Sequence, residues 1–256
     1  RKHLYRDAQS ALRRFRFLEA VLRPRDRLLD IGSGSGVFVC VLCRWGLNAS
    51  GIEPDEGNST FARQHLQVDV RTGFAKDTKE ESAFDVVTLH HVLGHMNNPL
   101  EELRHIRKLI RPGGYLMMEV PNAEDCRQDP GKRYHKAHLF TFDSQTLPAM
   151  VEKAGFKVHA TAIAPSNRNI TLLARKVEDV AFSPSSLIHN YRRIKGIIDG
   201  HKPGRYYFSS APYRKFVTNT LNKLWERGAL IFAGESRDII DAVIMKERRL
   251  DTNNTD

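Results

Sequence analysis

Cysteine is scarce in this sequence, and no long apolar run occurs. Three cysteines among 256 residues cannot supply a disulfide-rich scaffold, and they favour a reducing compartment. The longest unbroken apolar run, Val37 to Cys43, has seven residues, whereas a membrane-spanning helix needs about 20. We therefore expect a cytoplasmic protein with no transmembrane segment.

Low-complexity and repeated segments are also lacking. Hydrophobic residues make up 41% of the chain and aromatic residues 9%, which argues against a disordered or collagen-like protein. The length predicts one large domain, or a domain with an extension, that buries a sizeable core. The chain begins at Arg1 rather than Met, as expected if a preceding segment has been removed.

Positive charge is in excess and is concentrated near the N-terminus. The formal net charge is +10, and residues 1–27 alone carry nine basic and three acidic side chains. Apolar residues at helical spacing predict an amphipathic helix over 3–22, ended by Pro24. Its basic side chains form a solvated face, or else they contact nucleic acid, an anionic surface or an acidic substrate.

Strand and helix patterns alternate along the middle of the chain. We expect Pro112-Gly113-Gly114 to stop one of these helices, and segments 157–163 and 170–175 to form a terminal hairpin. This order predicts an α/β fold with a doubly wound, mostly parallel Rossmann-like sheet and helices on both faces. The predicted strands are 27–31, 49–53, 68–70, 84–89 and 115–120, and the predicted helices are 37–44, 59–66, 100–110 and 147–154.

The pattern after residue 177 changes to a mainly helical C-terminal extension. Helices are predicted over 185–198 and 212–230, while the apolar segment 238–246 fits either a strand or a helix. We expect the extension to form a lid or a substrate-recognition element. The predicted parts are an N-terminal basic helix over 1–27, an α/β core over 28–177 and the extension over 178–256.

A glycine loop follows the first predicted strand, in the sequence LLDIGSGSG from Leu28 to Gly36. Alternate glycines let the backbone approach a ligand closely, and the amides that start the next helix suit an anion such as a carboxylate. The third glycine stands one residue earlier than in the dinucleotide fingerprint, and no P-loop motif occurs. The loop therefore indicates a small-molecule cofactor and disfavours a nicotinamide-dependent oxidoreductase.

A carboxylate ends the second predicted strand. Glu53 stands 23 residues after Asp30, near the offset of about 20 residues at which open α/β sheets place an acid on a ribose diol. A carboxylate can accept hydrogen bonds from both hydroxyls. Asp55 is close enough to compete for this role, and a solvated acid at the end of a strand is the alternative.

Five sequence blocks together resemble the class I S-adenosylmethionine (SAM)-dependent methyltransferases, in particular the bacterial group of ubiquinone-type and sugar or polyketide O-methyltransferases. They follow the family's order and spacing between about Leu12 and Arg175. The resemblance implies a SAM cofactor and S-adenosylhomocysteine as its product. The blocks are LLDIGSGSG, GIEP, FDVVTLHHVLGHMNNP, RKLIRPGGYLMMEVPN and HLFTFDSQTLPAMVEKAGF.

The resemblance also implies a role for each matching residue in cofactor binding. The glycine loop would hold the methionyl end of SAM, with Asp30 as its support, and Glu53 would bind the ribose. Phe74 would lie on the adenine, while Leu89 and His90 would flank the sulfonium. The implied cofactor-binding residues are Asp30, Gly32, Ser33, Gly34, Gly36, Glu53, Pro54, Phe74, Leu89 and His90.

His138 is the main catalytic candidate. It lies in the long loop after the fifth predicted strand, at the sheet edge where active-site residues gather, and an imidazole titrates near neutral pH, so it can take a hydroxyl proton. Tyr134 and His135 are neighbours that could share this work. The alternative is that His138 only packs or orients the loop.

A metal site is not expected, although His90, His91 and His95 form a cluster. If this segment is helical, His91 and His95 share a face of the helix, but no carboxylate stands suitably to complete a ligand set. Gly94 replaces the Glu that many ubiquinone-type members carry there, which argues against metal dependence. The CxxC pair, Cys40 and Cys43, falls within a predicted helix and is interpreted as two buried core thiols.

The predicted function is transfer of a methyl group from SAM to a small-molecule or glycan acceptor, with O-methylation favoured. An RNA or DNA methyltransferase is an alternative suggested by the positive charge, but the [ND]-P-P-[FYW] motif of amino-methylating nucleic-acid enzymes is absent. A third alternative is a catalytically inactive SAM-binding or scaffold protein. The intact glycines and Glu53 argue against it, and the sequence does not indicate an oligomeric state.

Overall fold

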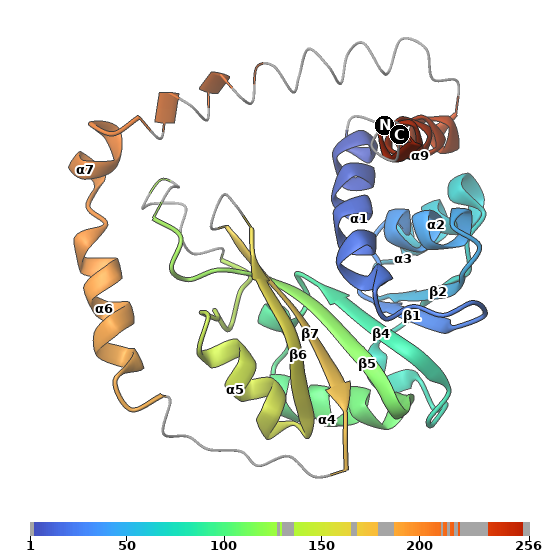
Figure 1. Cartoon of the computed structure of the whole chain (residues 1–256), viewed down its shortest axis with the longest axis horizontal. Helices are drawn as coiled ribbons and strands as arrows, with labels where there is room; N and C mark the ends of the chain where they lie inside the picture. The colour runs from blue at the N-terminus through green and yellow to red at the C-terminus, as the bar shows by residue number, and fades with distance from the viewer. Residues whose placement is uncertain are drawn as a thin grey trace. The chain divides into compact units, whose positions relative to one another are not determined.

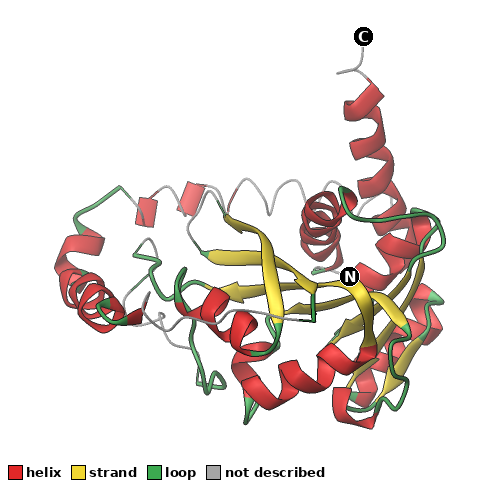
Figure 2. Ribbon diagram, turned by 60° about the horizontal axis from the view of Figure 1, so that its bottom comes forward, coloured by secondary structure: helices red, strands yellow, loops and turns green. Residues whose placement is uncertain are grey.

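The structure is a computed structural model that describes residues 3–126, 129, 136–164, 168–178, 187–210, 212–213, 216–217, 220 and 235–252. Seven strands form one sheet in the order β3-β2-β1-β4-β5-β7-β6 (Figure 1), and helices pack against the strands (Figure 2). The predicted α/β class with a mostly parallel sheet is confirmed. The chain divides into two compact units, residues 1–74 with 219–256 and residues 75–218.

The first unit contains three parallel strands and the helices that cover them. β1 pairs with β2 over its whole length, and β2 pairs with β3 in the register Gly51 opposite Val70. Its described elements are α1 (Leu4–Glu19), β1 (Arg27–Ile31), α2 (Val37–Arg44), β2 (Asn48–Glu53), α3 (Glu56–Phe61), a π-helical turn (Ala62–Leu66), β3 (Val70–Thr72) and α9 (Ser236–Thr252).

Burial explains why α1 and α2 form where they do. The apolar residues of α1 recur at helical spacing and are buried as one stripe, whereas the first six residues of α2 are all apolar and all buried. The two helices pack together, and Phe15 of α1 stacks on Trp45 just after α2, with ring centroids 4.7 Å apart. The helix α2 is thereby fixed directly behind the glycine loop.

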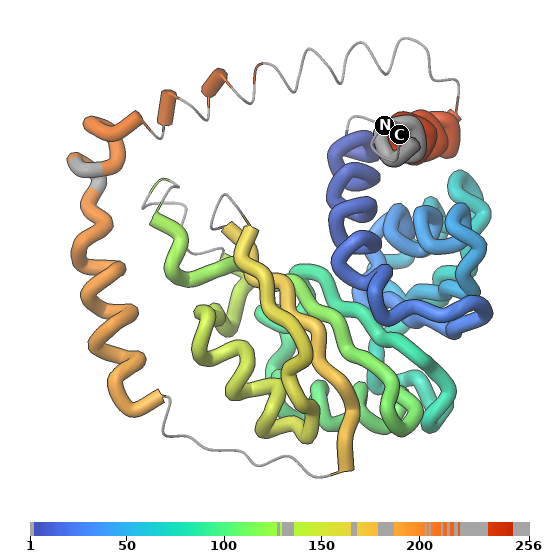
Figure 3. The backbone as a smooth tube through the Cα atoms, viewed as in Figure 1, coloured from blue at the N-terminus to red at the C-terminus, as the bar shows by residue number. Residues whose placement is uncertain are grey.

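The C-terminal helix α9 packs against α1 and α2 within this same unit (Figure 3). The apolar segment 238–246 is helical, and four of its residues, Ile239, Ile240, Val243 and Ile244, are buried, whereas Met245 is exposed. At its edge, Asp241 accepts two hydrogen bonds from the Arg44 guanidinium, at 2.7 and 3.2 Å.

The second unit contains the other four strands. β4 and β5 are parallel, while β5 with β7 and β7 with β6 are antiparallel, which confirms the predicted hairpin. Asn98 caps α4 by accepting from the Glu101 amide. The described elements are a 3₁₀ turn (Ala75–Asp77), β4 (Phe84–His90), a 3₁₀ turn (Leu93–His95), α4 (Pro99–Leu109), β5 (Ile110–Pro121), α5 (Thr146–Lys153), β6 (Phe156–Ile163), β7 (Asn169–Lys176), α6 (Asn190–Gly200) and α7 (Pro203–Tyr207).

Several predicted boundaries were wrong. The Pro112-Gly113-Gly114 segment does not stop a helix, because α4 ends at Leu109 and this segment already belongs to β5, whose Ile110 pairs with Phe84. Val70 begins the third strand rather than ending it, α3 begins earlier and passes into a π turn, and α6 begins at Asn190. Most of the helix predicted over 212–230 lies outside the described residues.

The two thiols of the CxxC pair differ in exposure. Cys40 is buried as predicted, and burial raises the pKa of its thiol to about 11. Cys43, in the last turn of α2, is exposed, contrary to the prediction, and its Sγ donates to the Ala49 carbonyl. None of the helices within the described ranges is long and apolar enough to span a bilayer.

Candidate functional site

The glycine loop between β1 and α2 requires glycine at several positions. Gly32, Gly34 and Gly36 have φ angles of 67°, 53° and 75°, in the left-handed region that side chains disfavour. A Cβ on Gly36 would lie 2.7 Å from the Ala62 Cβ, whereas a Cβ on Gly34 would meet no atom within 4 Å. Gly36 therefore permits close packing, and the backbone at Gly34 borders open space.

Glu53, at the end of β2, holds the glycine loop in place. Its Oε2 accepts a hydrogen bond from the Gly34 amide at 2.7 Å, and its Oε1 accepts from the Asp55 amide at 3.0 Å. The side chain is 9% exposed. Because a carboxylate offers about four acceptor positions, each oxygen can still accept from a further donor.

Asp55 caps a helix, unlike Glu53, which bonds the glycine loop. Its Oδ1 accepts from the Asn58 amide at 2.7 Å and caps the N-terminus of α3. This engagement favours Glu53 over Asp55 as the acid available to a ligand. Pro54 is exposed between them.

Two further predicted residues lie next to this loop. Asp30, in β1, is 3% exposed. The Ser33 hydroxyl is buried and has no hydrogen-bond partner among the described residues. Gly51, which the sequence analysis did not single out, makes room for Ser33, because a Cβ there would lie 2.6 Å from the Ser33 Oγ.

Phe74 follows β3 and borders the same region of the first unit. The Gly73 amide before it donates to the Glu53 carbonyl at 3.0 Å, which fixes the chain as it leaves β3. The Phe74 ring is 56% exposed. A large apolar ring held exposed beside a polar loop provides a surface on which another ring can stack.

These features fit the parts of SAM. The first amides of α2 have no side-chain cap, so they can receive the methionyl carboxylate. The Ser33 hydroxyl, which has no hydrogen-bond partner among the described residues, can bond the methionyl end of SAM. Glu53 has the acceptor capacity for two ribose hydroxyls. The open space at Gly34 leaves room for the ligand against the backbone.

In the second unit, the chain turns sharply where β4 ends. Leu89 is 1% exposed, so its side chain belongs to the core, and His90 is half-buried. His91 has a φ of 61°, its amide donates to the Glu119 carbonyl, and its Nε2 lies 2.9 Å from the Glu119 Oε1. This left-handed turn places His91 before the 3₁₀ turn that ends at His95, so the two residues do not belong to one helix and share no helical face.

The loop that carries His138 is fastened to Gly94 and His95. The Leu139 and Phe140 amides both donate to the Gly94 carbonyl, at 2.8 and 3.1 Å. The His95 Nδ1 lies 2.9 Å from the Ala137 carbonyl oxygen, and the His95 and His138 rings have centroids 4.5 Å apart. The half-buried imidazole of His138 is therefore held by backbone and ring contacts.

Gly94 allows this attachment because it has no side chain. A Cβ at this position would lie 2.8 Å from the Phe140 carbonyl oxygen. Tyr134 and His135, the other catalytic candidates, lie outside the described residues. No group of three His, Cys, Asp or Glu side chains suited to a metal occurs within the part of the chain that the structure describes.

Arg193 of α6 forms a junction that sequence reasoning missed. Its guanidinium donates to the Glu124 Oε1 at 2.9 Å and to the Asp143 Oδ1 at 3.1 Å. Asn190 adds a bond from its Nδ2 to the other Asp143 oxygen. These contacts attach α6 to the segments that follow β5 and the His138 loop, and no local pattern marks them because the partners stand 47 to 69 residues apart.

The family model for a methyltransferase domain matches residues 1–161. The chain belongs to the class I SAM-dependent methyltransferases. The SAM cofactor that the glycine loop suggests is therefore a property of the enzyme family as well as of the local geometry. The matched region contains the glycine loop, Glu53 and His138, but it ends before α6, α7 and α9.

Individual proteins that are similar to this chain in sequence are also methyltransferases. A ubiquinone biosynthesis O-methyltransferase of Aeromonas salmonicida (strain A449) is 31% identical over 173 residues, 62% of this chain and 68% of the relative. One from Pseudomonas aeruginosa (strain UCBPP-PA14) is 31% identical over 121 residues, 44% of this chain and 48% of the relative. The chain thus spans about half to two thirds of these relatives.

Solved structures share the fold. A SAM-dependent methyltransferase from Thermotoga maritima, described as a possible histamine N-methyltransferase, superposes with a TM-score of 0.53 at 22% identity. The match covers 68% of this chain and 91% of that structure. At this identity the likeness concerns the fold and leaves the acceptor open.

Proposed function

We propose that this enzyme transfers a methyl group from SAM to a hydroxyl of a small molecule or glycan. The observation that carries the proposal is the Glu53 carboxylate, which is buried and bonded to the Gly34 amide, yet retains acceptor capacity beside the open glycine loop. The ubiquinone O-methyltransferase relatives favour oxygen as the acceptor atom. A reducing, cytoplasmic setting fits the three cysteines.

The first unit supplies the residues that would hold the cofactor. Glu53 would accept from the ribose hydroxyls with Pro54 beside it, Phe74 would stack on the adenine, and Ser33 and the first amides of α2 would bind the methionyl end. Asp30 would support the loop. When bound, SAM supplies a methyl group on a positively charged sulfur, so the protein's main contribution is to align the acceptor.

The second unit supplies the candidate base and the end of β4. His138 would take the hydroxyl proton of the acceptor at an imidazole nitrogen, and the contacts with Gly94 and His95 would keep its ring in one orientation. Leu89 and His90, at the end of β4, are the residues to which the family resemblance assigns contact with the sulfonium.

A test of the base compares His138→Ala with His159→Ala, which removes an exposed imidazole from β6 in the same unit. Hydroxylated aromatics and sugars are screened with a radiolabelled methyl donor. We expect His138→Ala to lower kcat by about 10²–10⁴-fold and to remove the limb of the pH–rate profile that rises with deprotonation of the base. Equal kcat values for both variants would contradict the role of His138.

Nucleic acid remains an alternative acceptor because of the +10 charge. If RNA were the acceptor, its binding would weaken steeply with salt, since each phosphate contact releases counterions. We expect RNA binding that is weak and unaffected by S-adenosylhomocysteine, measured by fluorescence anisotropy between 50 and 200 mM salt. Tight binding that S-adenosylhomocysteine strengthens would favour the nucleic-acid reading.

A further inference from the structure

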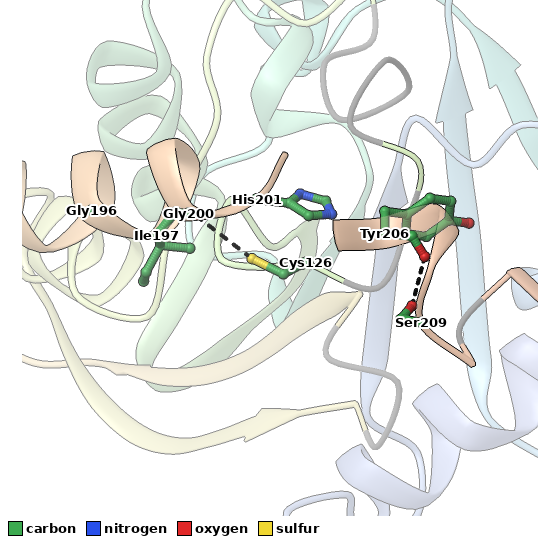
Figure 4. A pocket seen from close by; sticks show the side chains of 7 residues that line it. All are labelled: Cys126, Gly196, Ile197, Gly200, His201, Tyr206 and Ser209. Atoms are coloured by element: carbon green, nitrogen blue, oxygen red, sulfur yellow. Dashed lines mark hydrogen bonds between the residues drawn. The ribbon is translucent and has the colours of Figure 1, made fainter. Parts of the chain in front are cut away.

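A cavity of about 440 Å³ lies within the second unit, and all of its lining residues except Cys126 follow the region that the family model matches (Figure 4). One wall is the last turns of α6, with Gly196, Ile197 and Gly200, and another is Cys126. His201, Tyr206 and Ser209 line the remainder. This volume is in the range of cavities that hold small organic ligands.

The lining is uncharged apart from one imidazole, and the hydroxyl of Ser209 and the thiol of Cys126 are directed to backbone carbonyls of the protein. The Ser209 hydroxyl donates to the Tyr206 carbonyl at 2.7 Å, and the Cys126 thiol lies 3.9 Å from the Ile197 carbonyl oxygen. The rings of His201 and Tyr206 meet edge to face, with centroids 6.1 Å apart. The cavity therefore presents ring and aliphatic carbon, which suits an uncharged aromatic group.

The cavity is built on the same segments as the candidate base. Cys126 follows the carboxyl end of β5, where open α/β sheets bind their ligands. In that segment, the Ala123 amide donates to the Phe142 carbonyl at 2.8 Å and so joins it to the end of the His138 loop. Arg193 fastens α6 to both segments through Glu124 and Asp143.

We propose that this cavity binds an uncharged aromatic portion of the methyl acceptor. That the bound group belongs to the methyl acceptor rests on the proposed function. That the cavity binds an aromatic group rests only on its lining and volume. The residues after 161 that line the cavity thereby determine which acceptor is used, and this gives the C-terminal extension a role in acceptor selection.

Gly196 offers a variant that closes the cavity without crowding the protein. A Cβ on Gly196 would meet nothing within 4 Å, and the same holds for Gly204 of α7, which does not line the cavity. Leucine is also a better helix former than glycine. Gly196→Leu should therefore fold and fill the cavity, and Gly204→Leu is the matched control.

The experiment uses Cys126 as the reporter and 2-naphthol as the probe. Iodoacetamide labelling of Cys126 and of the other exposed thiol, Cys43, is followed by mass spectrometry. At a concentration ten times its Kd, 2-naphthol should slow labelling of Cys126 by about tenfold through occupancy, leave Cys43 unchanged, and have the same effect in Gly204→Leu. In Gly196→Leu, 2-naphthol should no longer protect Cys126 from labelling. In the wild type, 2-naphthoate, which is charged, should protect Cys126 less than 2-naphthol does.

The outcomes separate this inference from the proposed function, because S-adenosylhomocysteine binding is measured on the same samples. Binding of S-adenosylhomocysteine without protection of Cys126 would overturn the cavity assignment and leave methyl transfer intact. Protection without S-adenosylhomocysteine binding would support an aromatic site but overturn its assignment to a methyl acceptor. Protection that persists in Gly196→Leu would place the probe elsewhere and overturn the inference.

Discussion

At the scale of single residues, the absence of a side chain at Gly94 determines how the candidate base is held. The Gly94 carbonyl accepts two amides of the His138 loop, and the Phe140 carbonyl lies where a Cβ would be. The loop can pack this closely only against glycine. Gly94 is thus a positioning residue for His138, and not merely a departure from the pattern of ubiquinone-type relatives.

We expect Gly94→Ala to destabilise the protein by about 1–3 kcal/mol, as overpacking does. The measurement is the free energy of unfolding in urea. Gly204→Ala serves as the control, because its Cβ meets open space on a helix, and it should be neutral or slightly stabilising. Equal stability of both variants would show that the loop does not depend on contact with Gly94.

Residues that belong to a short sequence motif could be identified from the sequence. Residues that matter through partners far away along the chain could not. Gly32, Gly34 and Glu53 belong to short patterns with a known physical purpose. Both glycines have left-handed backbone and the Gly34 amide donates to Glu53, while their role in cofactor binding stays a prediction. Gly51 and Arg193 carry no such pattern. Their importance depends on Ser33 and on Asp143, which become neighbours only after folding.

At the scale of elements, α9 contributes to the core of the first unit mainly through apolar burial. Ile240 is fully buried, whereas Met245 of the same helix is 61% exposed. We expect Ile240→Ala to cost about 2–5 kcal/mol of the free energy of unfolding, from lost burial and a new cavity. Met245→Ala should cost far less, and similar urea midpoints for the two variants would contradict the packing of α9.

The attachment of α6 should depend on pH through Glu124. Burial tends to raise the pKa of this carboxyl, but hydrogen bonds from Ser144 and Arg193 outweigh it, so the pKa is lowered overall. A pKa that is lower in the folded state means that the stabilisation is complete above the pKa of the unfolded chain. It is lost as the pH falls through the folded value.

We therefore expect the wild type to be more stable than Glu124→Gln at pH 7, and this advantage to shrink as the pH falls below the ordinary range of a glutamate. Urea unfolding at several pH values measures the difference, and amide exchange of residues 190–200 localises it to α6. Glu101→Gln, on the exposed side of α4, is the control. A difference that does not change with pH would show that the Glu124 charge does not hold α6.

The elements that were predicted correctly are those with a strong pattern of their own. The ranges 27–31 and 37–44 match β1 and α2 at both ends. Here one apolar run ends at the glycine loop and another begins directly after it, so both boundaries are marked in the sequence. The prediction failed at 110–114, where turn residues join a strand. Pairing of Ile110 with Phe84 extends β5 through a proline and two glycines, so partners across the sheet overrode the local preference.

At the scale of the whole molecule, the chain contributes its last helix to the same unit as its first. The helix α9 packs on α1, more than 200 residues away in sequence, and Arg16 of α1 bonds Glu247 at 3.1 Å. Neither contact could be predicted from periodicity, which specifies a buried face but not its partner. The three-part division of the chain expected from its sequence stays a prediction.

If Glu53 and the glycine loop form the SAM site, S-adenosylhomocysteine binds there, and calorimetric titration measures this binding without an acceptor. The product needs no acceptor and undergoes no turnover. Wild type is compared with Glu53→Ala and with Glu56→Ala, which removes an exposed carboxylate three residues later.

We predict binding with a Kd of about 1 μM, or about −8 kcal/mol. Glu53→Ala should weaken it by about 1–3 kcal/mol, as expected when buried hydroxyls lose their partner, and Glu56→Ala should leave it unchanged. Absence of binding to the wild type, or equal affinity of the wild type and Glu53→Ala, would show that Glu53 and the glycine loop do not form the SAM site.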